Sequence, residues 1–148
     1  MEHKPKNKDF FDKMIESHKS FGREVSFAGG AWCWHGFAPL SGQTLRTMLP
    51  AMQSVIEHDI ENVMITMWGD AGQECSVNSL LHVLYTIKQF ADGNFDGVKI
   101  KEGFKQITGL DYDDFMLLDL PNLFADDEIM GEPHNPCSAE RHPLGSAF

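Results

Sequence analysis

The chain has 148 residues, and its 12 Lys and Arg against 22 Asp and Glu give a net charge of −10. This length predicts one domain, and the acidic balance argues against nucleic-acid or anionic-membrane binding, because both need clustered Lys and Arg. Three widely spaced cysteines, no apolar run of membrane-spanning length and no apolar segment behind the charged N-terminus predict a cytoplasmic protein.

Hydrophobic periodicity predicts alternating helices and strands over most of the chain. Apolar residues at steps of three and four are typical of helices, and short apolar runs of strand length indicate strands. In chain order we expect a helix over 9–21, a strand over 25–28, a helix over 42–58, a strand over 62–68, and helices over 77–91, 100–108 and 111–118. Ser41 is the expected N-cap of the second helix, and Pro50 predicts a kink or a helix start there.

The strand over 62–68 is an almost continuous apolar run, which predicts burial on both faces, as in a parallel sheet covered by helices. Two strand–helix units in succession predict parallel strands with crossover helices. Two strands are too few for a stable parallel sheet, so we expect a piece of a larger fold, or a chain that pairs with other copies. The residues divide into a globular part, 1–125, and an irregular or disordered tail, 126–148, rich in Pro, Gly and Ser.

Tryptophan, glycine and polar residues follow both predicted strands. Trp32 and Trp34 come after the first strand, and Trp68 and Asp70 after the second. Sites in parallel α/β folds form where the carboxyl ends of strands meet. An indole stacks on the apolar face of a pyranose while a carboxylate accepts hydrogen bonds from its hydroxyls, so this combination indicates a sugar site. The alternative for each tryptophan is core or loop packing, and strand alternation would point Trp32 and Trp34 to opposite sides.

Other combinations of reactive residues are weaker. Asp70 and Glu74 have the chemistry of an acid/base pair, although Glu74 serves equally well as a helix cap. Cys33 with His35, or His134 with Cys137, lack the further ligands of a structural zinc site, and Cys75 is best explained as a small buried residue. No nucleotide-binding motif is present. We therefore expect no metal, no cofactor and no catalytic residue in this chain.

Two segments, 25–39 and 63–75, together resemble the last part of the catalytic domain of glycoside hydrolase family 20, the exo-β-N-acetylhexosaminidases. They read Val-Ser-Phe-Ala-Gly-Gly-Ala-Trp-Cys-Trp-His-Gly-Phe-Ala-Pro and Val-Met-Ile-Thr-Met-Trp-Gly-Asp-Ala-Gly-Gln-Glu-Cys. The resemblance covers roughly residues 5 to 125. It implies an α/β fold that is a partial (β/α)8 TIM barrel, made of the last two β/α units (strands seven and eight) with their flanking helices.

The resemblance also assigns roles. Trp68 would wall the pocket for a terminal N-acetylhexosamine, Asp70 would bind the outer hydroxyls of the sugar, and Trp34 or Trp32 would complete the wall. No Tyr between Gly29 and Pro39 is present to hold the acetamido oxygen. The family's catalytic Asp-Glu pair follows a strand, whereas the only Asp-Glu dipeptide here, Asp127–Glu128, lies in the polar tail.

The chain is therefore expected to be an inactive fragment of a β-N-acetylhexosaminidase, a glycosidase of carbohydrate metabolism, whose partner is an N-acetylhexosamine-containing glycan. A truncated or frameshifted gene product would explain both the missing pair and the unfamiliar tail. Two alternatives stay open: a non-catalytic carbohydrate-binding or self-associating module, which would associate through its strand edges, and a small α/β enzyme that uses Asp70 and Glu74.

Overall fold

The computed structural model describes residues 7–34, 37–69 and 74–122. In these ranges the elements are α1 (Lys8–Lys19), β1 (Phe27–Gly30), α2 (Ser41–Glu57), β2 (Val63–Thr66), the 3-10 helix η2 (Val77–Leu80), α3 (Leu81–Ala91), α4 (Gly97–Thr108), α5 (Tyr112–Met116) and the 3-10 helix η3 (Leu117–Asn122). The predicted order of elements is confirmed, although each strand is four residues long and β1 begins and ends two residues later than the predicted strand over 25–28.

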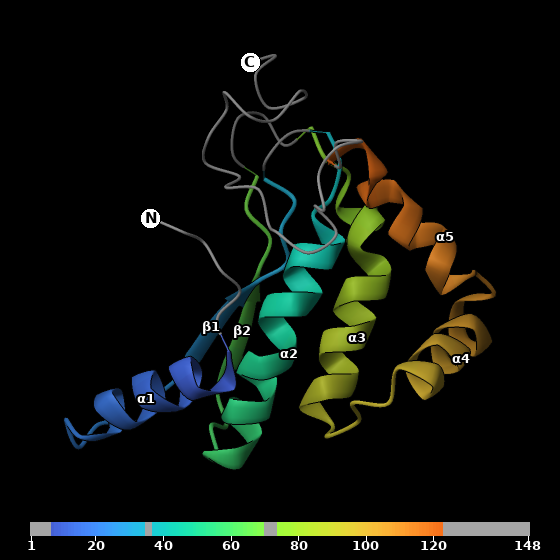
Figure 1. Cartoon of the computed structure of the whole chain (residues 1–148). Coiled ribbons are helices and arrows are strands. Elements are labelled where there is room, and N and C mark those ends of the chain that lie inside the picture. Colours follow the sequence, from blue (N-terminus) through green and yellow to red (C-terminus); the bar gives the residue numbers. More distant parts are fainter. Residues whose placement is uncertain (1–6, 35–36, 70–73, 123–148) are drawn as a thin grey trace.

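The two strands form one parallel pair, in which Phe27 faces Val63 and Gly30 faces Thr66. α2 connects them and packs between the strands and α3 (Figure 1). Figure 1 also shows α4 and α5 on the far side of α3 from the strands, while α1 lies at the opposite side of the molecule. The predicted parallel pairing and its helical crossover are confirmed.

The prediction of a partial (β/α)8 barrel is wrong. The described residues form a small domain that is mostly helical, with two short strands. The physical reason is that the core lies between helices: Val83, Ile87 and Phe90 of α3 meet Phe104 of α4 and Tyr112 of α5. Two four-residue strands contribute one edge of this core and cannot organise it.

The second strand is not buried on both faces as its apolar sequence predicted. Gly29 faces α2, because a Cβ atom at Gly29 would lie 2.7 Å from the Met48 sulfur. The neighbouring position in the pair, Met64, faces the other way and is 60% exposed. The sheet therefore has one face covered by helices and one open face.

α2 is one helix that runs through Pro50, so a helix that begins at Pro50 is ruled out. The predicted N-cap is also wrong, because Ser41 is inside the helix and its buried hydroxyl makes no hydrogen bond to a described residue. Instead the Asp119 carboxylate accepts a hydrogen bond of 2.7 Å from the Gly42 N–H. A carboxylate from η3, far along the chain, thus satisfies a donor in the first turn of α2.

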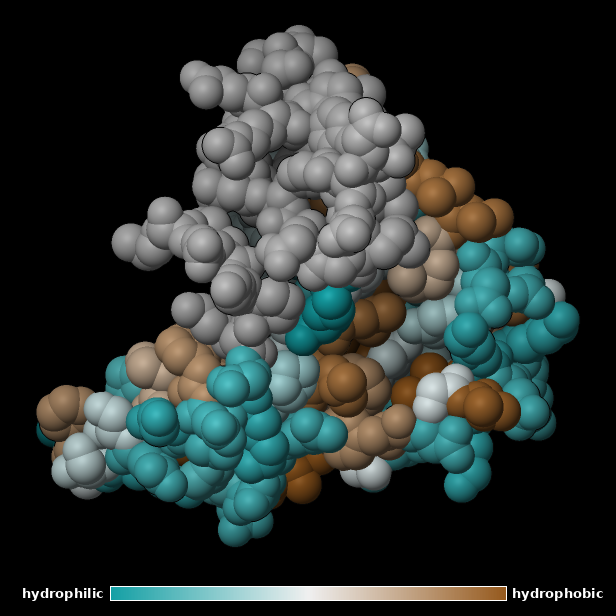
Figure 2. Space-filling model, viewed as in Figure 1, coloured by the Kyte–Doolittle hydropathy of each residue, from teal (hydrophilic) through white to brown (hydrophobic). Residues whose placement is uncertain are grey.

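The remaining helices form for the reasons that the sequence indicates. Asn7, Asp96 and Asp111 cap α1, α4 and α5 through side-chain oxygens, and Gly109 ends α4 with a φ of 73°. The apolar stripe of α1 is less buried than its periodicity predicted, because only Ile15 is buried. Figure 2 shows apolar residues gathered over α2 and α3, with more hydrophilic surfaces to either side.

Candidate functional site

The carboxyl ends of β1 and β2 lie side by side, as the sugar-site prediction required. The Ala31 N–H donates a hydrogen bond of 2.9 Å to the Thr66 carbonyl, which continues the strand pairing by one residue. The Thr66 hydroxyl donates to the Gly29 carbonyl at 3.0 Å. These two bonds fix the positions from which the loops that carry Trp32, Trp34 and Trp68 depart.

Trp32 and Trp34 are stacked, with ring centroids 5.1 Å apart and planes at 29°. The expectation that alternation separates them is wrong, because β1 ends at Gly30 and the next residues are not a strand. The Trp32 N–H donates to the Thr44 hydroxyl at 3.0 Å, and its carbonyl accepts from the Leu40 N–H at 2.9 Å. The backbone of the loop is therefore anchored to the start of α2, while both indoles stay half-buried.

Gly30 lies at the base of this aromatic pair. A Cβ atom at Gly30 would lie 2.8 Å from Cη2 of Trp34. The Trp34 indole therefore lies directly against the backbone of Gly30, the last residue of β1. A side chain at this position would displace the ring.

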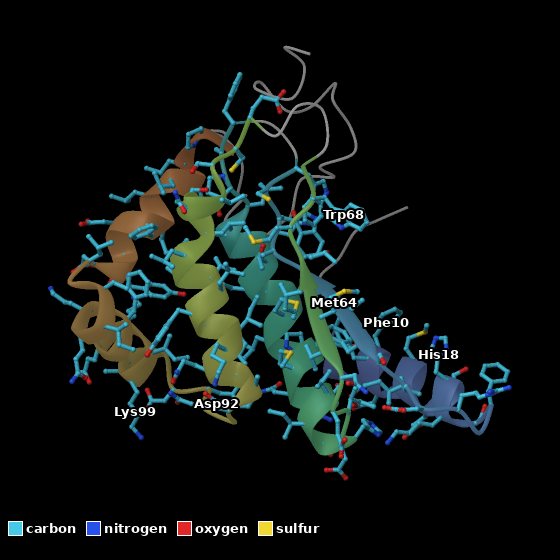
Figure 3. All side chains as sticks on the ribbon, turned by 180° about the vertical axis from the view of Figure 1, so that it is seen from behind. Phe10, His18, Met64, Trp68, Asp92 and Lys99 are labelled. Atoms are coloured by element: carbon cyan, nitrogen blue, oxygen red, sulfur yellow. The ribbon has the colours of Figure 1, made fainter. Side chains whose placement is uncertain are left out.

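Trp68 is 56% exposed and lies beyond the end of β2. The Cys33 thiol donates a long hydrogen bond of 3.5 Å to the Trp68 carbonyl, which joins the two loops. In Figure 3, Trp68 and Met64 lie on the side of the molecule opposite α3, α4 and α5. Asp70, the predicted hydroxyl-binding carboxylate, lies outside the described residues, so the structure joins three of the four predicted binding residues at one end of the strands and does not place the fourth.

The two cysteines next to these loops, Cys33 and Cys75, do not have the properties of reactive thiols. Cys33 and Cys75 are both free and buried. Burial, and then the neighbouring Cys75, raise the pKa of the Cys33 thiol, and burial raises the pKa of Cys75 despite a contact of 3.4 Å with the Ser79 hydroxyl. Both thiols are neutral at physiological pH, which agrees with the prediction that Cys75 is a small buried residue and excludes an activated nucleophile at either position.

The described ranges hold no group of three His, Cys, Asp or Glu side chains that could ligate a metal ion. His35, His134 and Cys137, the other members of the two weak metal pairings, lie outside these ranges, as does the Asp127–Glu128 dipeptide. Glu74 is described and half-buried, but its proposed acid/base partner Asp70 is not. The absence of a metal, a cofactor and a catalytic pair stays a prediction.

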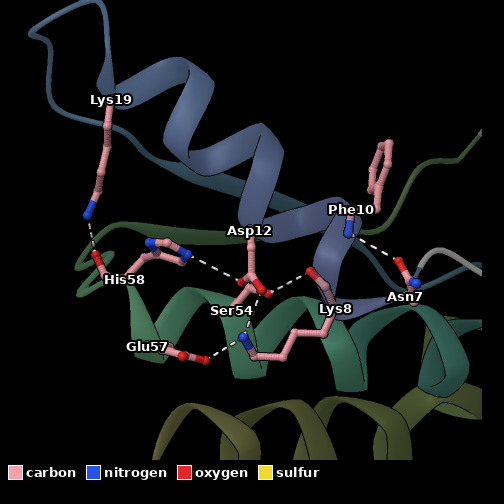
Figure 4. Close-up of polar contacts among 8 residues, drawn as sticks. All are labelled: Asn7, Lys8, Phe10, Asp12, Lys19, Ser54, Glu57 and His58. Atoms are coloured by element: carbon pink, nitrogen blue, oxygen red, sulfur yellow. Dashed lines mark hydrogen bonds and ion pairs between the residues drawn. The ribbon is translucent and has the colours of Figure 1, made fainter.

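A charged network ties α1 to α2 away from the tryptophans (Figure 4). Asp12 is 2.8 Å from Lys8 and 3.3 Å from His58, and Lys8 also pairs with Glu57. The Lys8 ammonium lowers the pKa of the Asp12 carboxyl. Because Lys8 pairs with both the Asp12 and the Glu57 carboxylates, across the contact between α1 and α2, we assign this network to helix packing.

His82 is the buried polar residue that sequence reasoning missed. Its apolar neighbour Leu81 is exposed, whereas His82 is fully buried between the Tyr112 and Phe115 rings. Neither imidazole nitrogen has a hydrogen-bond partner in the described part of the chain, and burial lowers the pKa of His82 to about 4. One feature of the sequence indicated a buried polar position here: Thr86 lies four residues after His82, on the same face of the helix.

No described helix is both long and apolar enough to cross a membrane. No family model matches the sequence, and no curated protein matches it either. The assignment to glycoside hydrolase family 20 therefore stays a prediction that rests on the two strand-end motifs.

Proposed function

We propose that this chain binds a terminal N-acetylhexosamine of a glycan through Trp68, with Trp34 and Trp32 as a second aromatic wall and Asp70 as the hydroxyl acceptor, and that it does not hydrolyse the sugar. The residues are those that the resemblance to the β-N-acetylhexosaminidases assigns. The proposal does not depend on a barrel, because it needs only two loops that meet at the ends of paired strands.

The exposure of Trp68 is the observation that carries this proposal. A tryptophan in the core buries its ring, whereas 56% of the Trp68 surface is open to solvent. The stacked pair of Trp32 and Trp34 lies in the adjoining loop, and both of its indoles are half-buried. An exposed indole such as that of Trp68 offers a flat apolar surface at a small entropic cost, which suits the C–H face of a pyranose.

The absence of hydrolysis follows from the sequence. A positioned general acid contributes about 10²–10⁴-fold to the rate. In the family that the chain resembles, a Glu that follows an Asp supplies this proton, and the acetamido oxygen of the substrate attacks the anomeric carbon. The described residues carry no Asp-Glu dipeptide. Aromatic walls alone position a sugar without lowering the barrier to bond cleavage.

Binding is tested by titrating the protein with methyl N-acetyl-β-glucosaminide while the indole N–H signals are followed by NMR. We expect saturable shifts of the three indole signals, and at least a tenfold loss of affinity in Trp68→Ala. Phe21→Ala is the matched control, because Phe21 is an exposed aromatic residue in the turn that follows α1. An unchanged affinity in Trp68→Ala would refute the proposal, as would equal losses in both variants.

Catalysis is tested with a chromogenic β-N-acetylglucosaminide. We expect no release of the chromophore above the buffer rate. Turnover that disappears in Asp70→Ala would show that the chain is an enzyme, and would favour the small-enzyme alternative that pairs Asp70 with Glu74.

Self-association is the second candidate function, and the open face of the strand pair favours it. Met64 is 60% exposed, and β2 pairs only with β1 among the described strands. An uncovered apolar strand is a template for association. Sedimentation velocity separates the two functions: self-association predicts a defined oligomer that Met64→Lys dissociates, whereas sugar binding alone predicts no dependence on protein concentration.

A cytoplasmic location is part of this proposal. The Cys33 and Cys75 thiols are free, which supports a reducing compartment.

A further inference from the structure

We propose that the outer edge of β2 pairs with β2 of a second copy of this chain, antiparallel and with Met64 at the two-fold axis. This inference rests on the self-association candidate and deepens it, because it names the edge, the direction and the register of the pairing. The described part of the chain contains one sheet, in which β2 is bonded to β1 alone. The other edge of β2 is therefore open to a further strand.

The backbone of β2 presents two residues at this outer edge. Along a paired strand, successive residues direct their N–H and C=O groups alternately toward the neighbouring strand and away from it. The Asn62 and Thr66 carbonyls each accept a hydrogen bond of 2.9 Å from the first strand or its extension. Val63 and Ile65 point their backbone groups the other way, and no described residue bonds to them there. A row of such groups is satisfied by an extended strand.

The opposite edge of the sheet is less accessible. There β1 directs the backbone of Ala28 and Gly30 outward, but Gly30 is buried and the Trp34 ring lies against it. At β2, by contrast, Val63 is 36% exposed and Met64 is 60% exposed. Figure 3 shows Met64 on the open side of the strand pair, with α2 behind it. The edge of β2 is thus the one that a second copy can reach.

The symmetry of β2 selects its own sequence as the partner. The outward residues Val63 and Ile65 lie on either side of Met64. When two copies run antiparallel with their Met64 residues opposite each other, Val63 of each copy lies opposite Ile65 of the other. This register pairs every outward N–H and C=O group of the strand, and a shift of two residues leaves some of them unpaired. It also sets β-branched side chains against each other, which is a favourable cross-strand combination.

The distribution of charge agrees with this pairing. Positions 62–68 carry no charged residue and no proline, the devices that keep exposed edges apart in other proteins. The exposed acidic residue before β2, Glu61, would lie opposite Met67 of the second copy. A parallel pair in register would instead set the two Glu61 carboxylates beside each other. Met64 lies opposite its own counterpart, so Met64→Lys would oppose two ammonium groups and separate the copies.

The register is tested by cross-linking at position 64. Met64→Cys is prepared in a Cys137→Ser background, which leaves the buried Cys33 and Cys75 as the other thiols. Oxidised glutathione is the oxidant. Facing residues of this kind in an antiparallel pair have Cα atoms about 4.5 Å apart, a distance that a disulfide spans. We expect most of the protein to become a disulfide-linked dimer.

Ala28→Cys in the same background is the matched control. Ala28 is exposed on the same open face and lies next to Met64 in the strand pair, but on β1. In the proposed dimer the two Ala28 positions are three strand spacings apart, about 14 Å, which no disulfide spans. We expect little linked dimer from this variant. Equal cross-linking of the two variants, or none in Met64→Cys, would overturn the register.

Val63→Pro tests the edge itself. Proline is tolerated at the first residue of a strand, and here it removes an N–H that points away from β1. Sedimentation velocity should show dimerisation at least tenfold weaker than in the unmodified protein. A dimer that Met64→Lys separates and Val63→Pro leaves intact would overturn the edge pairing and keep self-association through the open face. An unmodified protein that stays monomeric would refute both.

Discussion

The two sides of α2 differ in how completely they are packed. On the strand side, Met48 fills the space above Gly29 and is buried, and the Thr44 hydroxyl binds the backbone of the Trp32 loop. On the α4–α5 side, Leu45 and Leu49 line an open groove. One helix thus makes a closed, hydrogen-bonded contact with the strands and leaves an open groove toward α4 and α5. The difference indicates that the strand-end loops are held more closely against α2 than α4 and α5 are.

The largest expected effect tests this contrast with two neighbouring residues. Met48→Ala leaves a cavity in a closed contact and should lower the free energy of unfolding by about 2–5 kcal/mol. Leu49→Ala removes a side chain that is already partly in water, so we expect a loss of no more than about 1 kcal/mol. Urea denaturation of both variants measures the difference. Equal losses would show that the two sides of α2 are packed alike.

The second prediction concerns the buried imidazole on the groove side of the molecule. Because the pKa of His82 falls from 6.5 to about 4 on folding, the unfolded chain binds a proton between these pH values that the folded chain rejects. Stability should be full above pH 6.5, fall as the pH decreases toward 4, and be lower there by roughly 3 kcal/mol. His82→Leu should remove this dependence.

The carboxylates act in a different pH range, so they do not obscure this result. Hydrogen bonds lower the pKa of Asp12, Asp96 and Asp111 below 3.8, and their contributions are lost only as the pH falls through that lower range. Denaturant midpoints measured from pH 7.5 to 4 therefore report mainly on His82. A slope that persists in His82→Leu would show that the imidazole is not buried as described.

The smallest expected effect concerns the link between η3 and the start of α2. Asp119→Ala removes the acceptor for the Gly42 N–H and should lower stability by about 1 kcal/mol, as the loss of a helix cap does. Asp114→Ala removes an exposed carboxylate from the preceding helix and should change stability by less than about 0.5 kcal/mol. Thermal unfolding of both variants is the measurement, and an equal effect would mean that Asp119 does not act as a cap.

Local sequence patterns predicted the order of elements, because the formation of each helix or strand depends mainly on residues that are close in the sequence. The helix predicted over 100–108 is such a case, because α4 ends at Thr108 and Gly109 follows with a positive φ. The burial of each element could not be predicted, because it depends on partners far along the chain. Met64 belongs to an apolar run but faces no described helix, and Asp119 replaces Ser41 as the acceptor at α2.

The sequence predicted which loops form the candidate site, because these loops follow the ends of the two strands. Parallel pairing brings the loops after β1 and β2 together, so Trp32, Trp34 and Trp68 could be grouped from sequence. The stacking of Trp32 on Trp34 could not, since it depends on where β1 ends. The groove was missed for the same reason as the burial of His82: both arise from the packing of α3 against α4 and α5, which no local pattern encodes.

The most direct test of the sugar-binding account is saturation-transfer NMR with methyl N-acetyl-β-glucosaminide, in which the aromatic protons of the protein are irradiated selectively. The account predicts transfer to the ring C–H protons of one sugar face and to the acetamido methyl group, and its loss in Trp68→Ala. Transfer that is absent from the folded protein, or that persists unchanged in Trp68→Ala, would contradict it.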